Sequence, residues 1–232
     1  MEPVLFYGIP HGCSFGSIVA LEWSNLPYRL ARIDMLAKPA GYDRLYPTAQ
    51  TPALLTEDGE MLGESLAILN HIAARDLGKK LGFAQGTRSF DRVNEALAFL
   101  HTEVHGAFGP VWSTFKLAAD AATKDMLRAY GRDNVAHVLG KLDSRLAGRD
   151  SMVGEHRTVA DAYLFGIVRW AEYLELFRLE RDYPGLHRLV ARLERDPAVV
   201  FAHAIEEGEP AVTSGRFLGH VAIDEAAARI AA

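Results

Sequence analysis

The chain has 232 residues, of which 49% are hydrophobic, and it carries a formal net charge of -5 with a pI near 6.0. This composition is ample for a packed core and has no cationic excess to neutralise phosphates, so we expect a soluble globular protein with no nucleic-acid partner. No apolar run approaches the roughly 18 residues that cross a bilayer, so no membrane partner is expected. A single cysteine and an N-terminus without a secretory pattern favour a cytoplasmic location.

Short apolar runs alternate with helical periods over the first part of the chain. Glu57-Asp58-Gly59 supplies a tight turn between two of the expected strands. The pattern predicts a βαβ unit followed by a ββα unit, so residues 1–80 are expected to form a small mixed sheet covered by helices. The predicted strands are 4–7, 28–34, 53–56 and 60–62, and the predicted helices are about 14–24 and 65–77.

The rest of the chain is predicted to be helical. From about 88 to 205 the apolar residues recur at three- and four-residue spacing, which indicates an all-helical second domain at 88–205. A glycine-rich stretch near 80–87 separates the two parts. Residues 206–232 begin acidic and end in small residues, and we expect them to form a loosely held C-terminal extension.

A capping box is recognisable within the helical part. Thr158 and Asp161 have the Thr-x-x-Asp spacing in which each side chain satisfies an unpaired N–H group of the first helical turn. An apolar run follows them directly, so we expect a buried helix to begin here. We therefore interpret Asp161 as a helix cap rather than a catalytic acid.

Cys13 is the first candidate for chemistry. It lies in His11-Gly12-Cys13-Ser14, where an apolar strand run stops and a helical run begins. A helix N-terminus offers unpaired N–H groups and positive partial charge, which stabilise a thiolate over a thiol. The alternative is a small buried hydrophobic residue, which is the commoner role of an unpaired cysteine.

Two further segments suggest a site that binds a peptide or amino acid. In Gln50-Thr51-Pro52 a proline lies at the start of a predicted strand. A cis Thr51-Pro52 peptide bond would expose the backbone of Thr51, which a bound peptide could pair with as an added strand. The alternative is an ordinary trans proline. Glu64 and Ser65 open a helix, where a carboxylate and a helix N-terminus together suit an α-amino-acid head group. A simple helix cap at Ser65 is the alternative.

In this order, these segments resemble the cytosolic glutathione transferases over roughly residues 4–205, and most closely the bacterial beta class, in which cysteine replaces the tyrosine or serine of other classes. Three segments carry the resemblance, and the last is the most specific. Pro10–Ser14 corresponds to the Pro-Gly-Ala-Cys-Ser segment of the class. Thr102–Phe108 is similar to its Glu-Leu-His-Lys-Gly-Phe segment, and Thr158–Trp170 follows its Thr-(Ile/Val)-Ala-Asp-Ala-Tyr-Leu-Phe run.

The resemblance implies a thioredoxin-like N-terminal domain, an all-α C-terminal domain, a homodimer and a role in detoxification. It implies glutathione as co-substrate and no metal. Cys13 and His105 would be catalytic and face the glutathione sulfur. The residues implied to bind glutathione are Ser14, Lys38, Thr51, Pro52, Glu64, Ser65 and Thr102. Phe108, Val111, Trp112 and Phe115 are candidates for the electrophile pocket, although such residues are commonly core.

Departures from the family pattern keep other functions open. Gly106 stands where relatives have a lysine or arginine, Ala98 where they have a polar residue, and Tyr46–Gln50 lacks another cation and a turn glycine. The leading hypothesis is addition of the glutathione thiolate to a small apolar electrophile. The alternatives are thiol–disulfide exchange or peroxide reduction through Cys13, and a non-catalytic interaction module.

Overall fold

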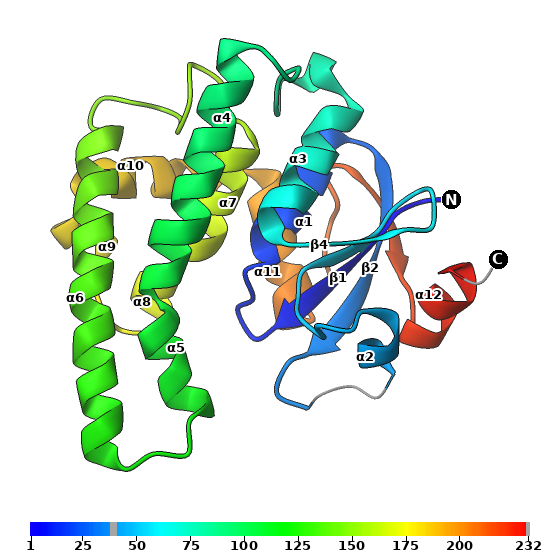
Figure 1. Ribbon diagram of the computed structural model, residues 1–232. Coiled ribbons are helices and arrows are strands. Elements are labelled where there is room, and N and C mark those ends of the chain that lie inside the picture. Colours follow the sequence, from blue (N-terminus) through cyan, green and yellow to red (C-terminus); the bar gives the residue numbers. More distant parts are fainter. Residues whose placement is uncertain (38–40, 231–232) are drawn as a thin grey trace.

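The computed structural model describes residues 1–37 and 41–230, and its first part is a mixed β-sheet with helices packed on it (Figure 1). The expected βαβ and ββα order is confirmed, with a short extra helix in the segment expected to be a loop. The elements are β1 (Val4–Ile9), α1 (Phe15–Ser24), β2 (Pro27–Asp34), α2 (Tyr42–Leu45), β3 (Ala53–Leu55), β4 (Met61–Gly63), α3 (Ser65–Arg75) and the 3-10 turn η1 (Leu77–Lys79).

The sheet has the strand order β4-β3-β1-β2-β5, in which β5 is Arg216–His220. β1 runs parallel to β2, and β3 is antiparallel to both β1 and β4. The central strand β1 is almost wholly buried because α1 and α3 cover one face and α2 and α12 (Ile223–Ile230) cover the other. Two peptide bonds beside the sheet are cis, Ile9-Pro10 and Thr51-Pro52.

The second part is helical, as expected. Its elements are α4 (Arg88–Phe99), the π-helix η2 (Leu100–His105), α5 (Gly109–Lys116), α6 (Ala121–Leu146), α7 (Val159–Val168), α8 (Trp170–Tyr173), α9 (Leu179–Asp182), α10 (Pro184–Leu193) and α11 (Pro197–Glu207). Over the described residues, no helix has both the length and the apolar character needed to cross a membrane.

The helix α7 joins the two parts of the molecule. Its capping box is present as predicted: Asp161 accepts hydrogen bonds from the backbone N–H of Met152 (2.7 Å) and Thr158 (2.8 Å). All ten residues of α7 are buried. Gly16 of α1 and Gly166 of α7 meet where a Cβ on either would lie 2.8 Å from backbone atoms of the other helix, so only glycines allow this approach.

The C-terminal segment corrects a prediction. Instead of hanging loosely, it forms strand β5 (Arg216–His220), parallel to β2, and helix α12 (Ile223–Ile230). Figure 1 shows its end on the sheet side of the molecule, near the N-terminus. Phe217 anchors the strand, with its ring 5.6 Å from Tyr28 and 5.3 Å from Phe201. The sequence conceals this strand because it is short, half-exposed and contains a glycine.

The carboxylate of Glu22 in α1 holds the segment that leads into β5. One oxygen accepts hydrogen bonds from the hydroxyls of Tyr28 and Thr213, and the other accepts from the backbone N–H groups of Ser214 (2.6 Å) and Gly215 (2.8 Å). Successive N–H groups that converge on a carboxylate form a concave anion site. Glu22 is buried, so these bonds replace the water that it gives up.

Replacing this carboxylate should loosen the tail. Glu22→Gln removes the charge and replaces one of the two accepting oxygens by an N–H₂ group, which cannot accept from these donors. We expect the free energy of unfolding to fall by about 2–3 kcal/mol, measured by urea denaturation. The control Glu95→Gln alters an exposed ion pair and should change nothing measurable. An unchanged stability for Glu22→Gln would contradict the role given to Glu22.

Candidate functional site

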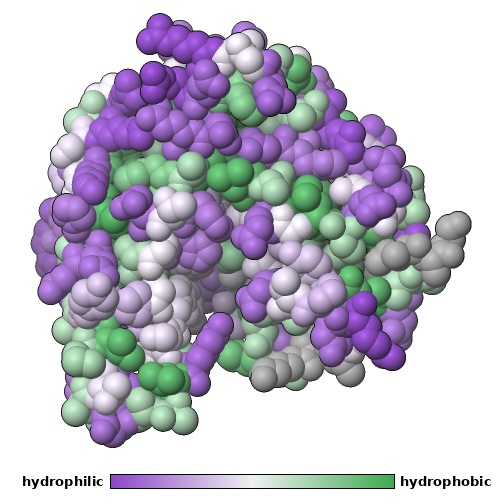
Figure 2. All heavy atoms as spheres, viewed as in Figure 1, coloured by the Kyte–Doolittle hydropathy of each residue, from purple (hydrophilic) through white to green (hydrophobic). Residues whose placement is uncertain are grey.

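A cleft with a volume of about 490 Å³ lies between the sheet domain and the helical domain. Figure 2 looks onto this side of the molecule, where the surface is hollowed between the two parts. The cleft is formed by the β1–α1 loop, the segment before β3, the start of α3, and the helices η2, α5 and α8. Of the residues predicted from the sequence, it is lined by Cys13, Thr51, Pro52, Glu64, Ser65, His105, Trp112 and Phe115.

The surroundings of Cys13 favour a thiol over a thiolate. Its Sγ donates to the carbonyl oxygen of Thr51 at 3.3 Å. Burial raises the pKa of Cys13 to about 11, the carboxylates of Glu64 and Glu206 act in the same direction, and a hydrogen bond with Ser65 opposes them. Desolvation of the charge thus opposes the thiolate that a helix N-terminus would favour.

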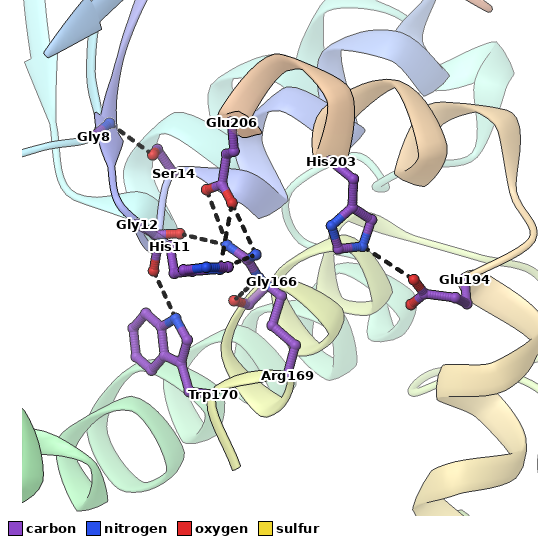
Figure 3. Close-up of polar contacts among 10 residues, drawn as sticks. All are labelled: Gly8, His11, Gly12, Ser14, Gly166, Arg169, Trp170, Glu194, His203 and Glu206. Atoms are coloured by element: carbon purple, nitrogen blue, oxygen red, sulfur yellow. Dashed lines mark hydrogen bonds and ion pairs between the residues drawn. The ribbon is translucent and has the colours of Figure 1, made fainter. Parts of the chain in front are cut away.

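Arg169, at the junction of α7 and α8, fixes the loop that carries Cys13 (Figure 3). Its guanidinium makes two contacts with the buried carboxylate of Glu206, at 2.8 and 2.9 Å. It also donates to the carbonyl oxygen of Gly12 (3.3 Å), to Nδ1 of His11 (3.2 Å) and to the carbonyl oxygen of Gly166 (3.1 Å). Every guanidinium nitrogen thus contacts an acceptor, and two of these acceptors belong to the loop.

Further contacts hold the β1–α1 loop in place. The indole N–H of Trp170 donates to the carbonyl oxygen of His11 at 2.7 Å, and the imidazole ring of His11 lies 3.7 Å from the ring of Tyr173. The Ser14 hydroxyl accepts from the N–H of Gly8 at 3.0 Å (Figure 3). Ser14 is completely buried and outside the cleft lining, so the predicted contact with glutathione is corrected to a structural role within the loop.

His105 lies at the end of the π-helix η2, opposite Cys13 across the cleft. Burial and the neighbouring His101 lower its pKa to about 4, so its imidazole is neutral at pH 7. Its Nδ1 is 3.0 Å from the hydroxyl of Tyr163, which is also 3.1 Å from Nδ1 of His101. A single turn of π-helix inside longer helices is a recurrent feature of functional sites.

Three further predicted residues do not line the cleft. Phe108 and Val111 are completely buried: Phe108 packs edge-on to Trp170, and Val111 packs against Gly131 of α6. The structure therefore places both side chains in the core rather than in the electrophile pocket expected from the sequence. Thr102 is exposed, and its hydroxyl donates to the carbonyl oxygen of Ala98, so its contact with glutathione stays a prediction. Lys38 lies outside the described residues, and its role also stays a prediction.

Ser65 is placed differently from its predicted cap. It is the first residue of α3, and Glu64 occupies the N-cap position with a φ of 65°. The side chain of Ser65 therefore does not cap the helix and instead lines the cleft. Glu64 stays largely exposed at the rim.

Several cleft residues were not singled out in the sequence. His101, Trp170 and Tyr173 line it, and Tyr163 reaches His105 from the buried helix α7. The spacing of His101 and His105, four residues apart, is a signal that both lie on one helix face. Tyr163 carries no such signal, because its position looks like any core position of an apolar helix.

Comparisons with known proteins identify the family. The model of the glutathione S-transferase N-terminal domain matches residues 13–75, and that of the C-terminal domain matches residues 89–197. The chain is 32% identical over 190 residues to glutathione S-transferase GST-4.5 of Xanthomonas campestris pv. campestris, covering 82% of this chain and 90% of that protein.

Solved structures that are similar to this chain belong to the same family. A sphingomonad glutathione S-transferase complexed with glutathione has a TM-score of 0.79 at 30% identity, covering 88% of this chain and 98% of the other. A bacterial beta-class enzyme from Sphingomonas chungbukensis has a TM-score of 0.78 at 28% identity, covering 88% and 98% of the two chains. The chain therefore belongs to the glutathione S-transferase family. The class drawn from the sequence, a glutathione transferase most like the bacterial beta class, is confirmed.

The protonation state of the Cys13 thiol can be measured directly. Because its pKa is raised to about 11, alkylation by iodoacetamide should accelerate steadily as the pH rises and show no plateau below about pH 10. Intact-mass spectrometry at each pH gives the rate, and Cys13→Ser, which lacks the only cysteine, sets the background. A plateau below pH 8 would show a stabilised thiolate and contradict this description.

The ion pair of Arg169 and Glu206 should be essential for stability. Arg169→Met leaves the Glu206 carboxylate buried without its cation, and we expect a loss of about 3–5 kcal/mol in the free energy of unfolding. The double variant with Glu206→Gln should recover part of this loss in a double-mutant cycle. The control Arg181→Met, at an exposed pair, should have no measurable effect. Strictly additive effects of the two substitutions would contradict the coupling.

Proposed function

We propose that the protein binds glutathione in the interdomain cleft, with its sulfur between Cys13 and His105, and adds the glutathione thiolate to small apolar electrophiles. The observation that carries the proposal is the composition of the cleft. Polar groups from the sheet domain and aromatic groups from the helical domain meet around the thiol of Cys13 and the neutral imidazole of His105.

The sheet side of the cleft suits the peptide. Glutathione has one ammonium and two carboxylates, and its backbone can pair with that of Thr51 in an extended form. Glu64 is available for the ammonium, and the first backbone N–H groups of α3 at Ser65 suit the γ-glutamyl carboxylate. Lys38 is proposed for the glycine carboxylate from the family resemblance alone.

The helical side suits an apolar, flat electrophile. Trp112 lies at the centre of an aromatic group, with its ring 5.3 Å from Trp170, 6.0 Å from Tyr173 and 5.8 Å from Phe115. These rings replace the buried Phe108 and Val111 as the proposed electrophile-binding surface. Aromatic walls of this kind bury planar apolar compounds and exclude water from the reacting sulfur.

The chemistry requires removal of one proton from the glutathione thiol. The sulfur then forms a bond to carbon, and the leaving group departs with the electron pair of the bond that breaks. Neutral His105 is available to accept a hydrogen bond or the proton. The protonated thiol of Cys13 donates its one hydrogen to the carbonyl oxygen of Thr51 in the free protein, and rotation about the Cβ–Sγ bond would turn that hydrogen to the glutathione thiolate. Cys13 thus helps to hold the glutathione sulfur rather than attacking the substrate.

The alternative reactions through Cys13 itself are less well supported. A thiol with a pKa of about 11 is roughly one part in 10⁴ thiolate at pH 7, and exchange with disulfides proceeds through the thiolate. A non-catalytic module has no specific observation in its favour.

Two further parts of the proposal extend beyond the cleft. A homodimer through helices α4 to α6 is supported by the exposed side chains of Met126 and Tyr130, and a monomeric mass in light scattering would contradict it. A cytoplasmic location follows from the composition and the single cysteine.

The proposal predicts retention on immobilised glutathione and accelerated conjugation of 1-chloro-2,4-dinitrobenzene. His105→Gln should lower kcat by roughly tenfold to a hundredfold, because the acceptor next to the thiol is lost. Cys13→Ala should keep conjugation within about tenfold, since only one hydrogen bond to the thiolate is lost. The control His156→Gln, outside the cleft, should match the unsubstituted enzyme.

Two outcomes would contradict the proposal. Absence of retention and conjugation at millimolar glutathione would overturn the transferase activity itself. Complete loss of conjugation in Cys13→Ala would favour direct chemistry at Cys13.

A further inference from the structure

We propose that His101 and Tyr163 are positioning residues that hold His105 in the tautomer whose Nε2 is free to accept a proton from the substrate thiol. The inference rests on the proposed function for its catalytic meaning. Its structural part, the tautomer of His105, is open to test in the free protein.

The four groups involved form a chain across the domain boundary. Glu64 Oε2, at the start of α3, lies 3.8 Å from Nε2 of His101. Nδ1 of His101 lies 3.1 Å from the Tyr163 hydroxyl, which lies 3.0 Å from Nδ1 of His105. The chain therefore runs from the rim of the cleft, through the buried hydroxyl, to the imidazole of His105, which lines the same cleft as Cys13.

The number of protons determines how this chain is arranged. A phenol has one hydrogen and a neutral imidazole has one N–H. The Tyr163 hydroxyl therefore donates to one Nδ1 and accepts from the other, and the two neutral histidines must be opposite tautomers. Burial raises the pKa of Tyr163, so its hydroxyl keeps its hydrogen at neutral pH.

Glu64 selects between the two arrangements. Its carboxylate lies 3.8 Å from Nε2 of His101, which is beyond hydrogen-bond length, so its negative charge rather than a hydrogen bond favours a hydrogen on that atom. Nδ1 of a neutral His101 is then an acceptor for the Tyr163 O–H, and the phenol oxygen accepts from Nδ1–H of His105. This leaves Nε2 of His105 without a hydrogen, as required of a group that takes a proton from a thiol.

The test combines nitrogen NMR of the histidine rings in the free protein with kcat and KM for conjugation. In the unsubstituted protein at neutral pH, His105 should carry its hydrogen on Nδ1. In Tyr163→Phe the Nε2–H form should appear, kcat should fall by roughly tenfold to a hundredfold, and KM for glutathione should stay within about twofold. His101→Ala, at a half-exposed position, should give a mixture of tautomers.

The control is Tyr183→Phe, which removes a hydroxyl outside the cleft lining and should change neither the histidine NMR signals nor kcat. A hydrogen on Nε2 of His105 in the unsubstituted protein would overturn the inference, and so would an unchanged tautomer in Tyr163→Phe. Absence of conjugation in the unsubstituted protein would instead overturn the proposed function, because the NMR measurement needs no activity.

Discussion

The contacts of Arg169 constrain the rest of the site. Its guanidinium, almost fully buried, joins the helical domain, the carboxylate of Glu206 and the loop before α1. The cation is tolerated there because each of its nitrogens has an acceptor. Since two of these acceptors are in the β1–α1 loop, the position of Cys13 depends on the helical domain as well as on its own strand and helix.

The chemistry of the cleft follows from this closeness of the two domains. The same packing that positions Cys13 also desolvates its thiol, which raises the pKa of Cys13, and burial lowers the pKa of His105, so both groups favour their neutral forms at pH 7. A site of neutral groups suits a reaction in which charge arises on the substrate sulfur and is met by hydrogen bonds already in place. The departures from the family pattern, such as Gly106, fit this description because the site does not rely on a nearby cation.

The sequence predicted what is encoded locally. The βαβ and ββα order along the chain, the capping box of Thr158 and Asp161, and the cleft positions of Cys13, Thr51 and Glu64 each depend on a short motif beside a recognisable element. The failures depend on packing. Helical spacing did not tell which face of η2 and α5 meets the core, so Phe108 and Val111 were misplaced. Desolvation of Cys13, the pairing of β5 with β2 and the approach of Tyr163 to two histidines arise only when distant segments meet.

The central claim is that glutathione binds in the interdomain cleft with its sulfur between Cys13 and His105. A crystal structure of the protein with glutathione tests it most directly. The account predicts the glutathione sulfur in contact with Sγ of Cys13 and within hydrogen-bond reach of Nε2 of His105, with the γ-glutamyl group at Glu64 and Ser65. Glutathione bound elsewhere, or with its sulfur turned away from both residues, would contradict it.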